Sequence, residues 1–289
     1  MDANYPPGER AALRAAWFER AADALQRVLP KAPRCYVCPL CIRGFARAAI
    51  DHRVLTLEDV PPKALGGSPL VLTCQECNTR HGGTLDSQVA GMENLFNFHG
   101  GTMPDPIRME LQFGGVPITA KVAATGHGII AISGRRGTPP VQVLKAAFEQ
   151  QQDIRFTFPP FKYRPALLSV WRAGYLAAFA WLGYRYILRP DVQAARRRLL
   201  DENDETLRVF TVTTPDDYPS TRRILVIKKP TSQRSLVIQI GRHSAILPWI
   251  NSRPDLYDLL ARHGGRKAAM VSDMWRPWPT EPEFAMDFQ

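Results

Sequence analysis

The chain has 289 residues, of which 45% are hydrophobic, so it can bury a substantial core and is long enough for two units. Its 37 Lys and Arg residues against 27 Asp and Glu give a net charge of +10. The odd number of cysteines, five, and a start (MDANYPPGER) without the basic and apolar regions of a secretory signal argue against a disulfide framework. We therefore expect a cytoplasmic protein.

Residues 8–29 are predicted to form an amphipathic helix, which makes up an N-terminal segment at residues 1–33. Its apolar side chains recur at helical spacing between Arg and Glu residues; they include Leu13, Trp17, Phe18, Leu25 and Val28. We expect this apolar stripe to pack on a neighbouring part of the chain rather than to bind a target.

All five cysteines lie within the first 77 residues, and they come in closely spaced groups. Cys35, Cys38 and Cys41 are each three residues apart, and Cys74 and Cys77 form another Cys-x2-Cys pair. Two such pairs a few dozen residues apart are typical of a structural four-thiolate Zn²⁺ site. We favour Cys38 and Cys41 as the first pair, because a proline helps to set the turn between them. Cys35 is then free or an alternative ligand.

The segment between the two cysteine pairs is predicted to form a β-hairpin. Alternation and β-branched residues mark strands at 53–57 and 70–73, a Pro-Pro pair ends the first strand, and a Gly-Gly pair lets the chain turn back. Residues 78–89 are expected to open as a short helix interrupted by two glycines. The turn that carries the first cysteine pair, the hairpin and the helix together make a predicted zinc domain at residues 34–95.

This order of motifs resembles the HNH, or ββα-metal, endonucleases that carry zinc. That family has a Cys-x2-Cys knuckle, an acidic residue followed by His, a proline, a Gly-Gly turn, and then Cys-x2-Cys-Asn at the start of a helix. Residues 58–67 (EDVPPKALGG) and 72–78 (LTCQECN) are similar to this pattern. The resemblance covers residues 35–90, under a quarter of the chain, and implies a treble-clef-like ββα domain.

The resemblance also implies roles for five residues of the hairpin and the helix. Asp59, His81 and Asp86 would bind a catalytic Mg²⁺ or Mn²⁺, which stabilises charge on the scissile phosphate. Asn78 would orient the hairpin or the base through hydrogen bonds, and Glu58 would align the base. Each residue has an ordinary structural alternative, such as a helix cap for Asn78 or a surface acid for Asp86.

The chain departs from the family at Asp59, where the family has the His that acts as general base. A carboxylate can also accept a proton or hold a metal ion, but it is a weaker base at neutral pH unless burial raises its pKa. His52 offers another imidazole, although its spacing to the Gly-Gly turn differs from that of the family. Asp59 is therefore the residue that separates an enzyme from a degenerate binding module.

Residues 96–289 are predicted to form a larger, basic α+β domain with antiparallel strands. Strands are expected near residues 107–113, 118–122, 128–132, 154–158, 207–213, 222–229 and 234–240. Helices are expected at residues 141–151, 191–202 and 253–262, and the Pro-rich tail from Trp275 to Gln289 is expected to wrap over the surface.

A long apolar helix is expected from Pro165 to about Leu188. Arg172 lies within this run, and basic residues flank it. A membrane span is the alternative, but there is no second span, so a helix buried in the core is the favoured interpretation.

The basic excess lies outside the predicted zinc domain. Residues 1–100 contain 11 Lys and Arg against 10 Asp and Glu, which leaves 26 against 17 for residues 101–289. Such an excess suits nucleic-acid phosphate, with a solvated surface or an acidic protein partner as the alternative. The candidate phosphate-binding residues are Arg80, Arg196, Arg197, Arg198, Arg222 and Arg223.

These expectations favour a metal-dependent endonuclease that hydrolyses or nicks nucleic acid, with DNA as the expected substrate. Bacterial defence is the context that the resemblance suggests, and the basic domain would supply binding or regulation. One alternative is a catalytically degenerate, zinc-stabilised module that binds nucleic acid without cutting it. Another is a regulator whose C-terminal domain senses a ligand or a phage protein.

Overall fold

The computed structural model describes residues 6–113, 116–125, 130–134, 145–146, 149–150, 153–201, 209–211, 222–262 and 271–285. The fold is α+β with antiparallel sheets, as predicted. The chain divides into unit 1, which joins Met1–Asp86 to Leu167–Gln289, and unit 2, Ser87–Ala166. This division differs from the predicted segments 1–33, 34–95 and 96–289, because the two ends of the chain share unit 1.

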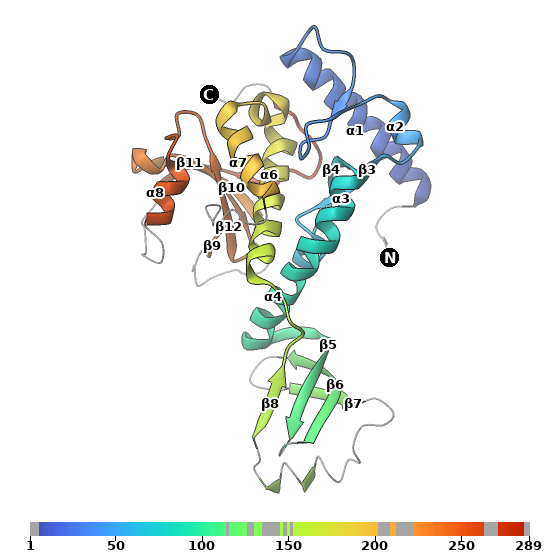
Figure 1. The fold of residues 1–289 in the computed structure, drawn as a ribbon, viewed down its shortest axis with the longest axis vertical. Coiled ribbons are helices and arrows are strands. Elements are labelled where there is room, and N and C mark those ends of the chain that lie inside the picture. The colour runs from blue at the N-terminus through green and yellow to red at the C-terminus, as the bar shows by residue number, and fades with distance from the viewer. Residues whose placement is uncertain are drawn as a thin grey trace. The chain divides into compact units, whose positions relative to one another are not determined.

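Helix α1 (Pro7–Val28) confirms the predicted N-terminal helix (Figure 1). Proline occupies its first position, where the N–H that proline lacks would have no helical partner. Trp17, Phe18 and Leu25 are buried. The helix contacts three strands of the predicted zinc domain: β1 (Tyr36–Val37), β3 (Leu55–Val60) and β4 (Ser68–Cys74). The apolar stripe thus packs within the chain, as expected.

Strands β3 and β4 form the predicted hairpin, paired antiparallel from Leu55 opposite Cys74. Their connection contains one turn of 3-10 helix, η1 (Lys63–Leu65), which ends at Gly66 with a φ of 69°. Gly67 is also required at the turn, since a Cβ there would lie 1.4 Å from a backbone oxygen. The Gly-Gly pair therefore lets the chain turn back, as the sequence indicated.

Helix α3 (Gln75–His81) follows β4 at once and continues through a π-helical turn, η2 (Gly82–Asp86), into helix α4 (Ser87–His99). The two glycines that were expected to interrupt the helix occupy this π turn. Because such a turn widens a helix without ending it, the helical path runs beyond the predicted 78–89. Its last part, α4, belongs to unit 2.

The second half of unit 1 contains a five-stranded antiparallel sheet in the order β13-β10-β11-β12-β9. Its strands are β9 (Val209–Thr211), β10 (Arg222–Lys229), β11 (Ser235–Ile240), β12 (His243–Pro248) and β13 (Val271–Pro277). Helix α8 (Leu256–Arg262) packs on it through a cluster made of Ile227, Val237, Ile246, Leu256 and Leu260. Strands β12 and β13 were not predicted. The first part of the expected surface tail is instead β13, paired with β10.

Helix α6 (Tyr163–Ile187) is the predicted long helix (Figure 1). It is long and apolar enough to cross a membrane, but 94% of that stretch is buried inside the protein, as expected of a core helix. The helix is kinked at Gly183, whose φ is 66°. There the Ala180 carbonyl oxygen accepts hydrogen bonds from the N–H groups of Glu283 and Phe284, at 2.7 and 3.0 Å. This part of the tail therefore packs into the kink instead of lying over the surface.

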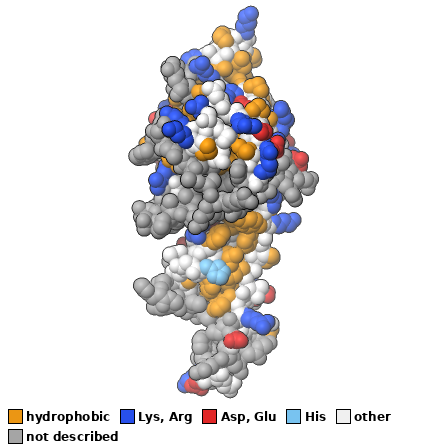
Figure 2. All heavy atoms as spheres, turned by 90° about the vertical axis from the view of Figure 1, so that its left-hand side faces the viewer, with side chains coloured by type: hydrophobic (Ala, Val, Ile, Leu, Met, Phe, Trp, Pro, Cys, Tyr) orange, Lys and Arg blue, Asp and Glu red, His pale blue; other side chains and the backbone are white. Residues whose placement is uncertain are grey.

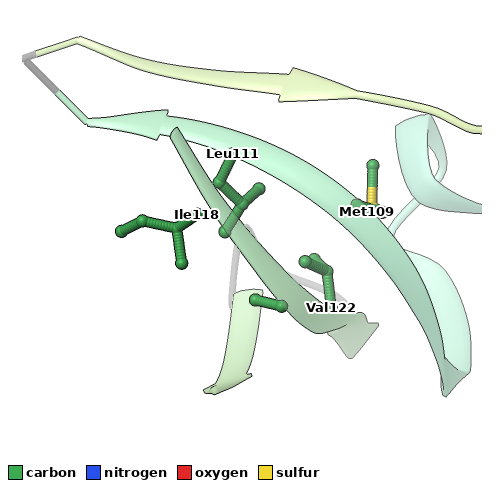
Figure 3. Close-up of a cluster of buried hydrophobic side chains, with 5 residues drawn as sticks. Met109, Leu111, Ile118 and Val122 are labelled. Carbon is green, nitrogen blue, oxygen red and sulfur yellow. The ribbon is translucent and has the colours of Figure 1, made fainter. Parts of the chain in front are cut away.

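Unit 2 combines α4 with a four-stranded antiparallel sheet in the order β7-β6-β5-β8. The strands are β5 (Thr102–Phe113), β6 (Val116–Thr125), β7 (Ile130–Gly134) and β8 (Ile154–Thr157). Figure 3 shows buried side chains of β5 and β6, where Leu111 is paired with Ile118. These strands agree with the prediction, whereas most of the helix expected at 141–151 lies outside the described residues.

Candidate metal centre and adjoining pocket

The four cysteines favoured from the sequence form one cluster. The Sγ atoms of Cys38, Cys41, Cys74 and Cys77 all lie within 4.8 Å of one another, and Cys35 is not part of the group. Four converging thiols match the ligand number and the type of ligand atom of a structural Zn²⁺ site. The arrangement can thus hold a metal ion, and its chemistry favours zinc.

Each cysteine pair is positioned by a backbone turn. The first pair lies between β1 and β2 (Gly44–Phe45), where the Cys38 N–H donates to the Arg43 carbonyl oxygen at 2.9 Å. The second pair lies where β4 meets α3, and the Cys74 N–H donates to Cys38 Sγ at 3.4 Å. The backbone of one turn therefore bonds a ligand of the other, which fixes the two halves of the centre together.

Hydrogen bonding stabilises the thiolate form of two of the ligands. A hydrogen bond with Cys38 lowers the pKa of Cys41 to about 4, and another with Cys38 lowers the pKa of Cys74 to about 6. Arg43 contributes to both shifts, since it donates to the two sulfur atoms at 3.5 and 3.7 Å. Thiolates are the form that binds metals, so this electrostatic environment suits a cation.

A pocket of about 420 Å³ lies beside the hairpin and the helix that carry the metal centre. Four of the five predicted catalytic residues line it: Glu58, Asp59, Asn78 and Asp86. His81 is not among the lining residues, whereas Arg10 and Lys63 are. Neither of these two cations was predicted from the sequence to belong to the site.

A β-bulge lets two consecutive acids of β3 line the same pocket. Neighbouring residues of a regular strand point to opposite faces, but the register with β4 shifts between Glu58 and Asp59. Glu58 is buried, while the Asp59 side chain is 22% exposed and its Oδ2 lies 3.7 Å from Lys63 Nζ. The position at which the family has its general base thus holds a carboxylate open to solvent.

Asn78 joins helix α3 to the first strand of the hairpin. Its Nδ2 donates to Thr56 Oγ1 at 2.9 Å and to the Leu57 carbonyl oxygen at 3.3 Å. An asparagine that caps a helix would instead accept hydrogen bonds from the backbone N–H groups of that helix. The observed contacts tie helix α3 to the hairpin, and a part for Asn78 in catalysis stays a prediction.

Arg172 of α6 connects the two deeper acids of the pocket. Its side chain is 1% exposed and donates to Glu58 Oε1 and, at 3.4 Å, to Asp86 Oδ2. Burial raises the pKa of Glu58, and the Arg172 charge opposes that shift. Glu58 is therefore a charge partner of Arg172, and its predicted contact with a base is not seen among the described hydrogen bonds.

Two hydroxyl groups complete this network. Thr73 of β4 donates to Glu58 Oε2 at 2.8 Å, and Ser169 of α6 donates to Asp86 Oδ1 at 2.6 Å. Sequence reasoning missed Arg172 and Ser169 as part of the site. The available signal was the lone arginine inside a long apolar helix, because a buried charge needs a partner.

His81 lies at the end of α3 and is buried. Burial, followed by the charges of Arg172 and Arg80, lowers the pKa of His81 to about 4, so its imidazole is neutral at pH 7. Within the described residues, His81, Asp59 and Asp86 do not form a group of ligand atoms that could hold a metal ion, whereas the four cysteines do. A catalytic metal held by this trio stays a prediction. His52 is exposed at the end of α2 (Ala48–Asp51) and does not line the pocket.

Two of the six arginines predicted to bind phosphate donate hydrogen bonds to backbone oxygens within the protein. Arg196 of α7 (Pro190–Leu200) is buried and donates to the Leu40 carbonyl oxygen of the zinc knuckle, and Arg222 donates to the carbonyl oxygens of Leu65 and Gly66. These two cations thus form hydrogen bonds between segments far apart in the chain, and their predicted role in phosphate binding stays a prediction.

The other four predicted arginines differ in exposure. Arg80 and Arg197 are exposed, Arg223 is half-buried, and Arg198 lies over the Tyr257 ring. On the face seen in Figure 2, Lys and Arg side chains are dispersed among acidic, polar and hydrophobic ones.

No protein-family model, curated protein or solved structure matches this chain. The resemblance to HNH endonucleases thus rests on the motifs of residues 35–90 alone. The geometry adds that those motifs carry a four-thiol centre and line a pocket rich in acids.

Proposed function

We propose that the protein is a metal-dependent endonuclease that hydrolyses phosphodiester bonds of nucleic acid. The observation that carries the proposal is the pocket in which Glu58, Asp59, Asn78 and Asp86 meet beside the four-thiol centre. These are the positions to which the resemblance assigned catalysis, and they come from both the hairpin and the helix. DNA as the substrate, the cytoplasm as the location and defence as the context are parts of the same proposal.

In this proposal each residue of the pocket has its own role in hydrolysis. The water oxygen bonds to phosphorus as the bond to the leaving oxygen breaks, and Asp59 takes the proton from the water. Asp59 and Asp86 offer carboxylate oxygens, which Mg²⁺ and Mn²⁺ prefer. Such a cation, when bound, stabilises the charge that develops on the phosphate. Arg172 and Ser169 hold Asp86 in place, and Asn78 fixes the hairpin that carries Asp59.

The test is a supercoiled-plasmid assay of the full chain with Mg²⁺ or Mn²⁺ at low salt. We expect nicked or linear plasmid from the wild type, and at least a hundredfold slower reaction from Asp59→Asn, since general base catalysis contributes factors of about 10²–10⁴. Asp51→Asn is the matched control, because it removes one carboxylate from an exposed position just before the hairpin. Equal rates for the two variants would contradict the role of Asp59.

A second candidate is a zinc-stabilised module that binds nucleic acid without cutting it. The observation in its favour is that cations already lie against the pocket acids, with Arg172 beside Glu58 and Asp86, and Lys63 beside Asp59. A wild type that shifts labelled DNA in a gel yet leaves plasmid intact with every metal would support this candidate over the enzyme.

A further inference from the structure

The N-terminal helix brings positive charge to the candidate active-site pocket. Arg10 of α1 lines the pocket together with Lys63, which comes from the turn of the hairpin. The acids of the pocket are thus flanked by two cations from different parts of the chain. A pocket that holds both carboxylates and cations can receive a metal ion and an anion at once.

More positive charge continues along the same side of α1. Arg14 follows Arg10 by four residues, so the two side chains lie on one face of the helix, about one turn apart. Arg53, just before β3, is exposed. Burial lowers the pKa of Arg14, and the nearby charges of Arg53 and Arg10 lower it further. Arg14 is therefore near enough to both Arg10 and Arg53 for its charge to be repelled by theirs.

Part of this cluster lacks a counter-charge. Within the described part of the chain, neither Arg14 nor Arg53 forms an ion pair with a carboxylate, and the buried Nε of Arg14 has no hydrogen-bond partner. Gathering like charges beside one another is unfavourable unless an anion neutralises them. Elsewhere in this region arginines are paired; Arg47, for example, lies 3.3 Å from Glu19.

We propose that Arg10 and Lys63 hold the phosphate that reacts in the pocket, while Arg14 and Arg53 hold neighbouring phosphates of the same nucleic-acid backbone. Helix α1 is then a substrate-binding arm as well as a packing element. The identity of the reacting phosphate rests on the proposed function, but the binding itself does not. Backbone phosphates are the recognised groups, so affinity should depend on salt and little on sequence.

The test measures binding by fluorescence anisotropy of labelled duplex DNA and of labelled single-stranded RNA. The full, zinc-loaded chain is used without added Mg²⁺ or Mn²⁺, and salt is varied. We expect the Arg10→Ala/Arg53→Ala double variant to bind at least several-fold more weakly. The slope of log affinity against log salt should become shallower by about 2, roughly 0.9 for each lost duplex contact.

The matched control is Arg27→Ala, singly and in a pair with Arg185→Ala. Both residues are exposed, and Arg27 lies on the same helix, about 25 Å from Arg10 along its axis. This pair removes the same charge as the test pair, so it should leave the slope nearly unchanged. Equal slopes for the two double variants, or a wild type that binds neither probe, would overturn the proposal.

This outcome is separable from that of the plasmid assay. If the double variant loses binding while the wild type never cuts, phosphate binding by α1 is supported and the nuclease proposal fails. If the wild type cuts and the double variant binds and cuts as well as it does, the nuclease proposal stands and the binding arm fails. Preference for DNA or RNA follows from which probe responds.

Discussion

At the scale of the residue, Arg172 shows how one charge links the core to the candidate site. The ion pair with Glu58 is nearly solvent-free, since the two side chains are 1% and 4% exposed. A buried pair of this kind adds little net stability over a well-packed apolar pair, but removal of one partner leaves the other charge uncompensated. Arg172 is therefore a positioning residue whose loss should affect both folding and the pocket.

We expect Arg172→Met to lower the free energy of unfolding by about 3–5 kcal/mol, because Glu58 stays buried without its counter-charge. Urea unfolding at saturating zinc measures this. Arg185→Met, at an exposed position on the same helix, should change stability by no more than about 0.5 kcal/mol. Adding Glu58→Gln to Arg172→Met should restore part of the loss. If Arg172→Met costs no more than the control, the pair is not a structural requirement.

At the scale of the element, the metal centre depends on two turns that are unstable alone. Strands β1 and β2 contain two residues each, too few for an independent hairpin. A metal ion that joins this knuckle to the β4–α3 junction supplies folding energy directly, because the unfolded chain has no preformed site. The same hairpin and helix carry Asp59 and Asn78, so loss of the metal should also disorder the pocket.

We expect Cys74→Ser to lose the bound zinc and to melt at a clearly lower temperature than the wild type. Cys35→Ser should keep both properties, because Cys35 lies outside the four-thiol cluster. Elemental analysis of the purified proteins and thermal unfolding followed by circular dichroism provide the two measurements. Zinc loss in Cys35→Ser, with zinc retained in Cys74→Ser, would show that the ligand set is different.

At the scale of the whole molecule, the region that carries the four thiols is completed by the C-terminal half of the chain. The Tyr184 hydroxyl donates to the Val37 carbonyl oxygen and accepts from the Val37 N–H, at 3.0 and 2.9 Å. The Tyr175 hydroxyl donates to the Pro39 carbonyl oxygen at 2.9 Å. Both tyrosines belong to α6, so the turn that carries Cys38 and Cys41 depends on α6 for part of its hydrogen bonding.

A chain that ends at residue 100 should therefore fail to fold, even with zinc. It lacks α6 and with it the tyrosines and Arg172, which leaves Glu58 without its counter-charge and the Val37 and Pro39 carbonyl oxygens without their donors. The near-ultraviolet circular dichroism and the cooperativity of thermal unfolding test this, and co-expression of residues 160–289 provides the control. A cooperative melt of the short chain alone would show that the zinc region folds by itself.

Much of the local structure follows from the sequence because it depends on nearby residues. The apolar spacing of α1, the hairpin with its glycines, the strands of unit 2 and the core helix α6 were all predicted. Strand β12 was missed because the chain turns back after β11 within two residues, and β13 because its pattern merges with a Pro-rich tail. Pairing between distant segments leaves no local signal of that kind.

The sequence by itself predicted a four-thiol centre from its Cys-x2-Cys pairs, but the spacing left Cys35 open as an alternative ligand, and the structure decided that Cys35 lies outside the cluster. It also predicted four of the residues that line the pocket, namely Glu58, Asp59, Asn78 and Asp86. Only the tertiary structure decided what surrounds them, because contacts between Arg172 and Asp86 or between Arg10 and the pocket join segments far apart in the chain. Likewise, charge composition gave the number of arginines, but tertiary packing decided that Arg196 and Arg222 bond backbone oxygens within the protein. A sequence records which groups are present, and packing determines which of them remain open to a ligand.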